Sequence, residues 1–156
     1  MKKVAVAVAL FMAVFVNAQT FTGTVVKVKD GDTVVILDSL KTMHTIRLAG
    51  VDAPEKTQDF GVVAKQFVSD AIFAKVVKTK VITTDRYGRS IGWIYYDGKN
   101  IAEELLKAGL AWHYKQYDKQ QYLQDLEDKA RENKVGLWIL PNPIYPSLYR
   151  KDKTKP

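Results

Sequence analysis

The sequence predicts a mixed α+β domain, and three observations support this. Segments with strand patterns come first, a segment with helical spacing interrupts them, and two further helices close the order. The chain has 156 residues, which is enough for one domain with a real core and too few for two. Hydrophobic residues make up 47% of the chain, and we see no repeat and no low-complexity segment, so we expect a globular protein.

Five segments are expected to form strands because their residues alternate in polarity or are rich in β-branched side chains. Short sequences rich in Asp and Gly separate several of them and indicate tight turns. The expected strands are 21–29, 33–37, 42–48, 76–83 and 90–96.

Three segments are expected to form helices. Residues 60–73 carry apolar side chains at helical spacing. The second helix begins at Asn100, where Glu103 completes a capping box, and ends at Gly109. Asp118 is expected to cap the third helix. The expected core face of that helix consists of Tyr122, Leu126 and Ala130.

The order of three strands, one helix and two strands is that of the OB-fold, a barrel that binds oligonucleotides. The expected architecture is therefore a five-stranded Greek-key β-barrel (OB-fold) with three α-helices. This order alone is not specific, and the chemistry has to be read from individual side chains.

The N-terminus has the pattern of a secretory signal peptide. Lys2 and Lys3 precede the 13-residue apolar run Val4–Val16, which is too short to span a bilayer comfortably. Val16-Asn17-Ala18 then resembles a small-residue cleavage site. We therefore expect a signal peptide at residues 1–18, a secreted or periplasmic protein, and no membrane contact after cleavage.

We expect the folded domain to cover residues 19–140 and residues 141–156 to form an irregular basic tail. Pro141, Pro143 and Pro146 favour irregular backbone, and the segment Arg150–Lys155 holds four positive charges against one Asp. The formal net charge of +7 is compatible with a polyanionic partner, although solubility alone can account for it. The absence of Cys excludes a zinc–thiolate site.

The stretch Ile46–Glu55 is the first candidate for a functional site. It reads as a strand end followed by a break at Pro54, with Arg47, Asp52 and Glu55 crowded together. If the preceding hairpin turns at Asp38–Lys41, cross-strand partners have numbers that sum to about 79, with an error of about one. Asp32 then lies opposite Arg47, and Asp30 stands at the same turn.

Several carboxylates in one place repel one another unless a cation joins them. Oxygen ligands without Cys or His nearby favour a hard cation, namely Ca²⁺, Mg²⁺ or Mn²⁺. Arg47 and Arg89 add guanidinium groups that bind phosphate oxygens in pairs. Arg86 and Tyr87, on the turn before Arg89, are suited to holding a phosphate or stacking on a base. Together these groups predict phosphodiester hydrolysis.

Three charged motifs stand in order along the chain: Asp30-Gly31-Asp32-Thr33, Ile46-Arg47-Leu48 with Val51-Asp52-Ala53-Pro54-Glu55, and Asp85-Arg86-Tyr87-Gly88-Arg89. In these motifs the chain resembles the thermonuclease (staphylococcal nuclease-like) family, from about Thr20 to Trp138. That family has an OB-fold of five strands and three helices, in agreement with the element order above.

The resemblance implies a Ca²⁺ site and a set of catalytic roles. Asp32 and Asp52 match the carboxylate ligands, and Ala53 matches a position, usually threonine, that supplies its backbone carbonyl. Glu55 matches the general base that positions the attacking water. Arg47 and Arg89 match the two arginines on the scissile phosphate, each identified in this sequence by its place in the motifs quoted above.

Two features depart from the family pattern. The loop between Glu55 and Phe60 is shorter than in the best-known member and lacks its lysine-rich tip. A nucleotide-stacking tyrosine of the family falls at or near Trp112, and Tyr114 is the other candidate. Trp112 is suited either to stacking or to core packing.

The leading hypothesis is an exported, monomeric, Ca²⁺-dependent nuclease that cleaves DNA and RNA and has no stable protein partner. The alternative is a non-catalytic OB-fold nucleic-acid-binding module, which the presence of all five site acids and arginines disfavours. A surface protein that binds acidic glycans is a third reading, and it leaves the acid cluster unexplained.

Overall fold

The computed structural model describes residues 19–153. The predicted signal peptide at residues 1–18 therefore lies outside the described residues. Within residues 19–153, no helix has both the length and the apolar character needed to cross a membrane.

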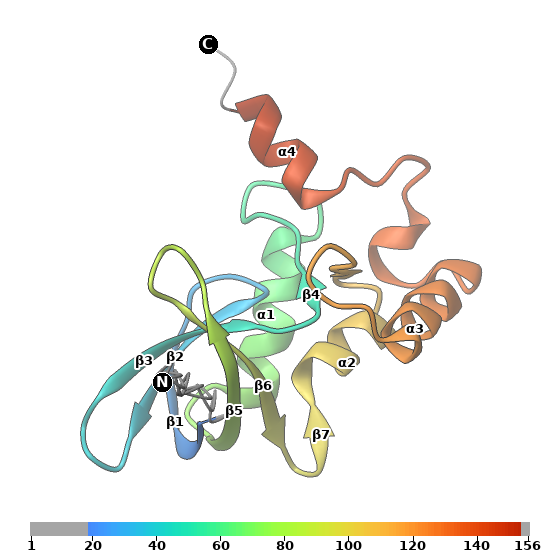
Figure 1. Cartoon of the computed structure of the whole chain (residues 1–156). Coiled ribbons are helices and arrows are strands. Elements are labelled where there is room, and N and C mark those ends of the chain that lie inside the picture. The colour runs from blue at the N-terminus through green and yellow to red at the C-terminus, as the bar shows by residue number, and fades with distance from the viewer. Residues whose placement is uncertain (1–18, 154–156) are drawn as a thin grey trace, which may run out of the picture.

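Five long strands close into a barrel (Figure 1). They run in the spatial order β3-β2-β1-β5-β6, and a parallel pairing of β3 with β6 closes the ring. This arrangement confirms the predicted mixed α+β fold and its five-stranded barrel. The strands are β1 (Thr20–Val28), β2 (Thr33–Asp38), β3 (Met43–Leu48), β5 (Val76–Thr84) and β6 (Ser90–Tyr96).

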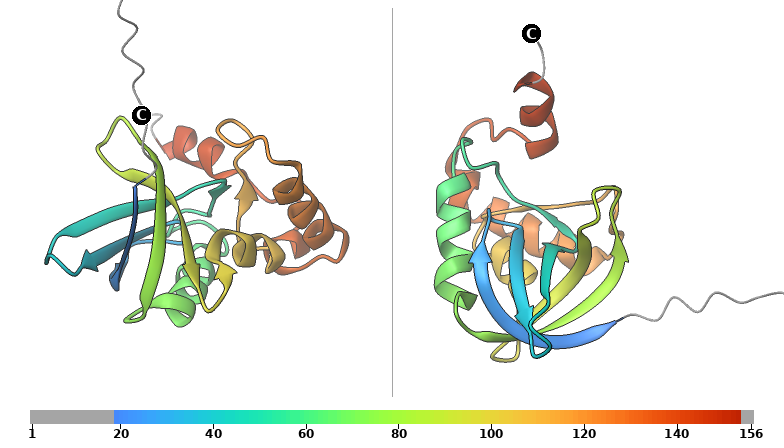
Figure 2. Two further views of the ribbon diagram at one scale, coloured as in Figure 1. Left: turned by 60° about the horizontal axis from the view of Figure 1, so that its bottom comes forward. Right: turned by 90° about the vertical axis from the view of Figure 1, so that its left-hand side faces the viewer.

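The barrel is accompanied by helices and by three two-residue strands. Figure 2 shows α1 along one side of the barrel and α4 standing away from it. Within the described residues there are four α-helices where the sequence predicts three. The helices are α1 (Gly61–Ile72), α2 (Ile101–Lys107), α3 (Gln121–Glu132) and α4 (Pro146–Lys153), with a 3₁₀ turn η1 at Gly136–Ile139. The short strands are β4 (Val51–Asp52), β7 (Lys99–Asn100) and β8 (Trp112–His113).

The main core fills the barrel and the space beneath α1 and α2. Alternate residues of β3, Ile46 and Leu48, are fully buried because successive side chains of a strand face opposite sides. On α1 the buried residues recur every third or fourth position, as helical periodicity requires. A second, smaller cluster of Trp112, Ala130, Leu137 and Trp138 joins β8 to α3 and η1.

The two ends of α2 follow the predicted chemistry. The Asn100 side chain accepts a hydrogen bond from the Ala102 amide at 3.0 Å, which caps the first turn. Gly109 adopts φ +62° just after the helix, a left-handed conformation in which an added Cβ would lie 2.1 Å from the Val135 carbonyl oxygen.

The predicted start of α3 is wrong, and its predicted core face is right for Ala130 and for the partly buried Leu126 but wrong for Tyr122. The Asp118 side chain accepts from the Gln120 amide at 2.8 Å, and the helix begins only at Gln121. The buried residues of α3 are Leu123, Glu127 and Ala130, whereas Tyr122 is exposed. The reason is that the Glu127 carboxylate is buried to accept the His113 amide and to pair with Arg131, a role that hydrophobic periodicity does not predict.

The predicted irregularity of the tail 141–156 is also wrong for its central part. Pro146 is the first residue of α4, a position where its missing N–H costs no helical hydrogen bond. The Tyr149 hydroxyl lies 2.8 Å from the carbonyl oxygen of Thr57 and 3.1 Å from its hydroxyl. The tail thus returns to the loop that follows Glu55.

Candidate active site

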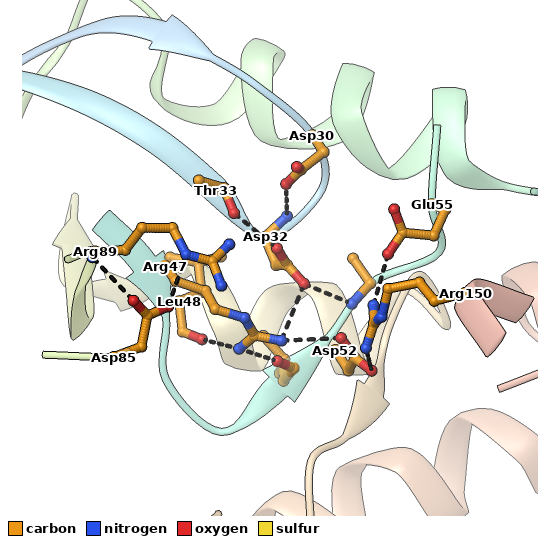
Figure 3. Close-up of polar contacts among 12 residues, drawn as sticks. Asp30, Asp32, Thr33, Arg47, Leu48, Asp52, Glu55, Asp85, Arg89 and Arg150 are labelled. Carbon is orange, nitrogen blue, oxygen red and sulfur yellow. Dashed lines mark hydrogen bonds and ion pairs between the residues drawn. The ribbon is translucent and has the colours of Figure 1, made fainter. Parts of the chain in front are cut away.

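The β2–β3 hairpin brings the first two charged motifs together (Figure 3). Thr33 pairs with Arg47, and the Leu48 amide donates to the Asp32 carbonyl at 2.8 Å. The register differs by one from the predicted value, which is within its stated error. Asp32 consequently lies beside Arg47, as the sequence predicts.

Arg47 is the centre of the site. Its Nη1 donates to the carbonyl oxygens of Leu48 (3.1 Å) and Val51 (3.0 Å). Its Nη2 donates to Asp52 Oδ1 at 2.9 Å and lies 3.4 Å from Asp32 Oδ2. The side chain is only 11% exposed, so these contacts form in a largely desolvated environment. Arg47 therefore fixes the positions of β4 and of both carboxylates.

The Asp52 carboxylate is fully buried. Burial, and then the negative charge of Asp32, raise its pKa to about 6, although Arg150 and Arg47 act in the opposite direction. The two arginines thus offset only part of the effect of burial and of Asp32 on the pKa of Asp52.

Asp32 is held by its neighbours on three sides. Its Oδ1 accepts from the Thr33 hydroxyl at 2.9 Å, and its Oδ2 accepts from the Ala53 amide at 3.0 Å. Its own amide donates to Asp30 Oδ1 at 3.1 Å. Asp30 therefore helps to orient the turn, and burial and the charge of Asp32 raise its pKa to about 6.

The donor set fits a hard cation. Asp32 and Asp52 contact the same guanidinium nitrogen, so their carboxylates are close enough to share one ion. A cation would also add positive charge that stabilises the ionised form of the buried Asp52 beside Asp32. Among residues 19–153, no group of three or more His, Cys, Asp and Glu side chains is arranged to hold a metal, so carbonyl and water oxygens would complete the shell.

Glu55 lies at the open edge of this cluster, with its side chain 39% exposed. Its amide donates to the Gln58 side chain at 3.1 Å. Its carboxylate accepts from Arg150 Nη1 at 2.6 Å, and Arg150 Nη2 lies 3.3 Å from Asp52 Oδ2. Sequence reasoning missed Arg150, because the contact spans 95 residues and no local motif marks it.

Arg89 reaches the same side of the barrel from β6. Ser90, the first residue of β6, pairs with Ile46 of β3 in the parallel contact. Arg89 directly precedes Ser90 and is therefore close to the part of β3 that carries Arg47. In Figure 3 the Arg89 side chain extends toward Arg47 and Asp32. Asp85 orients it through a 2.7 Å contact to its Nε.

The turn before Arg89 is exposed. Tyr87 is 68% exposed, and Arg86 stacks on its ring at 4.8 Å and donates to its hydroxyl at 2.7 Å. The Arg89 guanidinium lies 5.6 Å from the same ring. This places a cationic and aromatic surface next to the carboxylate cluster.

The two aromatic candidates of β8 differ in their surroundings. Trp112 is 4% exposed and makes edge-to-face contacts with Trp138 and Tyr145, so it has the core role that the sequence left open as an alternative. Tyr114 is half-buried, and Arg47 lies over its ring at 5.0 Å. Both residues line a pocket of about 320 Å³ whose rim also carries Arg131.

The chain was compared with known proteins. A family model described as "Staphylococcal nuclease homologue" matches residues 45–140. An uncharacterized endonuclease from Escherichia coli O157:H7 is 40% identical over 132 residues, which is 84% of this chain and 86% of that protein. A micrococcal nuclease from Shigella flexneri is 37% identical over 162 residues, covering 97% of this chain and 92% of that protein.

A longer plant relative also matches. The staphylococcal-like nuclease CAN1 of Arabidopsis thaliana is 45% identical over 108 residues, or 69% of this chain, and the chain spans 33% of its length. The bacterial relatives match along most of their length, and the family model covers Arg47, Asp52, Glu55 and Arg89. The chain therefore belongs to the staphylococcal nuclease family, and it is an enzyme of the nuclease class, as its motifs predict.

Proposed function

We propose that this protein is an exported, Ca²⁺-dependent nuclease that hydrolyses phosphodiester bonds of DNA and RNA. The observation that carries the proposal is the position of Arg47 between two buried carboxylates, with Glu55 at the open edge. Family membership supports the reaction class, and the relatives named as nucleases support a nucleic-acid substrate.

In this proposal Asp32, Asp52 and the Ala53 carbonyl hold the cation. When bound, a hard cation supplies positive charge that stabilises the phosphate oxygens in the transition state. The burial of the Asp52 carboxylate beside Asp32 supports its ligand role, and the amide contact from Ala53 to Asp32 supports a preorganised loop. Ca²⁺ is proposed because all the available ligands are oxygens and Ca²⁺ accepts oxygen ligands in flexible geometry.

Glu55 acts as the general base. It takes a proton from water as the new bond from water oxygen to phosphorus forms and an ester P–O bond breaks. Its partial exposure supports access of that water. Arg47 and Arg89 donate hydrogen bonds to phosphate oxygens and neutralise the charge that develops on the five-coordinate phosphorus.

Arg86, Tyr87, Trp112 and Tyr114 are proposed to contact substrate around this centre. The exposed ring of Tyr87 supports stacking on a base. Tyr114 is the stronger of the two β8 candidates because it adjoins Arg47, while Trp112 contributes at most the edge of its ring to the pocket.

Cleavage of plasmid DNA and of RNA tests the proposed function. The purified mature chain is incubated with each substrate in Ca²⁺ and, separately, in excess chelator, with Glu55→Gln beside it. Glu103→Gln is the matched control, because it removes one carboxylate charge on α2. We expect cleavage of both substrates only with the cation, by the wild type and the control. Binding without cleavage in either tube would instead support the non-catalytic module.

Export is tested separately. We propose cleavage after Ala18, so that mature protein from the periplasm or the medium begins at Gln19. Mass spectrometry of fractionated cells checks this, and full-length protein in the cytoplasmic fraction would contradict it. The mature chain is expected to elute as a monomer on size exclusion.

A further inference from the structure

The C-terminal helix α4 contacts the carboxylates that the proposed reaction uses. Arg150 Nη1 lies 2.6 Å from Glu55 Oε1, and Nη2 lies 3.3 Å from Asp52 Oδ2 (Figure 3). One guanidinium therefore bridges the proposed general base and a proposed cation ligand. Neither the family resemblance nor the motifs of the sequence assign a role to this residue.

With Arg150 docked, each carboxylate oxygen of Asp52 contacts one arginine. Arg47 holds Oδ1 at 2.9 Å, and Arg150 approaches Oδ2. A metal ion bound to Asp52 needs one of these oxygens. A divalent cation and a guanidinium also repel each other at such a short distance. Because Arg47 already holds Oδ1, Arg150 in this position and a cation on Asp52 compete for Oδ2.

Arg150 also engages the base. Its Nη1 lies 2.6 Å from Glu55 Oε1, so the guanidinium occupies a position on that oxygen where a water molecule would otherwise donate a hydrogen bond. The guanidinium in addition lies on the side of Glu55 that faces Asp52, between the base and the proposed cation ligand. The attacking water needs the same space.

The docking of α4 has the character of a reversible contact. Arg150 is 42% exposed and Leu148 is 55% exposed, and Figures 1 and 2 show α4 apart from the barrel. The segment 141–145 between η1 and α4 has no helix or strand, and Tyr145 packs edge-on against Trp112. The Arg150–Glu55 pair is partly exposed on both sides and is therefore weak, and a cation that binds Asp52 replaces the charge that Arg150 supplies to this buried carboxylate.

We propose that Arg150 competes with the metal ion for Asp52. Without the cation, α4 is docked and Arg150 covers the site. Cation binding to Asp52 releases Arg150 and undocks the helix. This inference rests on the proposed function, since it takes Asp52 as a cation ligand. It makes α4 an autoinhibitory element of the nuclease.

Direct cation binding tests the competition. Isothermal titration calorimetry with CaCl₂ alone compares the metal-stripped wild type with Arg150→Ala, Arg150→Lys and Lys151→Ala. Lys151→Ala removes the same charge from the next position of α4 and controls for general electrostatics. We expect Arg150→Ala to lower the Kd for Ca²⁺ about three- to tenfold, with Arg150→Lys between it and the wild type. Lys151→Ala should leave the Kd within about twofold.

Hydrogen exchange of α4 amides tests the undocking. In the wild type, Ca²⁺ should accelerate exchange in residues 147–153 while the barrel strands keep their protection. In Arg150→Ala the exchange should already be fast without Ca²⁺ and should not respond to it. A thermal unfolding scan of each variant verifies that the barrel is intact.

The outcomes separate this inference from the proposed function. Equal or weaker Ca²⁺ binding by Arg150→Ala, or exchange in α4 that slows with Ca²⁺, overturns the competition while leaving the metal site in place. If Ca²⁺ binds to neither the wild type nor Arg150→Ala, the Ca²⁺ site of the proposed function is refuted, and the proposed competition is refuted with it.

Discussion

Replacing each of the two arginines of the site by methionine should produce the same loss of activity but very different losses of stability. Methionine keeps an apolar stem of similar length and removes only the guanidinium. Arg47 is 11% exposed and donates to two carbonyls and two carboxylates. Arg89 is 35% exposed, and its side chain pairs with Asp85 on the surface.

The expected magnitudes follow from these surroundings. In Arg47→Met the buried Asp52 and two carbonyl oxygens lose their partner, and breaking a buried pair in this way costs about 3–5 kcal/mol. For a domain of this size that lowers the unfolding midpoint by about 10–20 °C. Arg89→Met loses a partly exposed pair and should cost no more than about 1 kcal/mol. Both variants should lose about 10²–10³ in kcat, as expected for removing one donor to the transition state.

Thermal unfolding in chelator, followed by circular dichroism, measures the stability of both variants without any contribution from bound metal. Turnover on single-stranded DNA is then measured with Ca²⁺ at a temperature where each variant is folded. Equal stability losses in the two variants would refute the assignment of Arg47 as a structural centre. Wild-type turnover in folded Arg89→Met would remove Arg89 from the phosphate site.

Three further predictions concern the carboxylates. Glu55→Gln should reduce kcat by about 10²–10⁴ and keep both the fold and substrate affinity, and a wild-type rate would remove Glu55 as the base. Asp52→Asn should raise the Ca²⁺ midpoint at least about tenfold in calorimetry, and an unchanged midpoint would contradict its ligand role. Because burial raises the pKa of Asp52 from 3.8 to about 6, the folded state binds this proton more tightly than the unfolded chain. Urea unfolding in chelator measures the free energy of unfolding of the wild type and of Asp52→Asn. Relative to this variant, the free energy of unfolding of the wild type should fall by up to about 3 kcal/mol as the pH rises from 4 to 7. A difference between the two proteins that does not depend on pH would refute the shift.

The strands and the heart of the site were predictable because local rules determine them, whereas the β1–β5 and β3–β6 pairings that form the barrel join distant residues and followed only from the element order. Strand alternation places Ile46 and Leu48 in the core and sends Arg47 to the other face. The short turn of the β2–β3 hairpin determines its register, and the register brings Asp32 to Arg47. Each step connects residues fewer than about 20 positions apart, where turn geometry and side-chain period suffice.

Long-range packing decides what could not be predicted. The sequence of α4 is short and polar, and helices of this length depend on tertiary contacts that no local pattern shows. Trp112 could be read as stacking or as core, and only the neighbouring Trp138 and Tyr145 decide for the core. The buried face of α3 includes Glu127 because its carboxylate accepts a hydrogen bond from the His113 amide, which hydrophobic spacing does not predict.

The site divides into two parts that differ in how firmly they are held. Asp32, Arg47 and Asp52 are buried and belong to strands, or directly adjoin them, so their geometry persists as long as the barrel does. Glu55 and Arg150 are exposed by about two fifths and stand on a loop and on a helix near the end of the chain. These two groups are not part of the hydrophobic core, so their movement changes access to the site without disturbing core packing. A nuclease built in this way can stay folded and closed without its cation, because the groups that hold the fold and the groups that open the site are different residues.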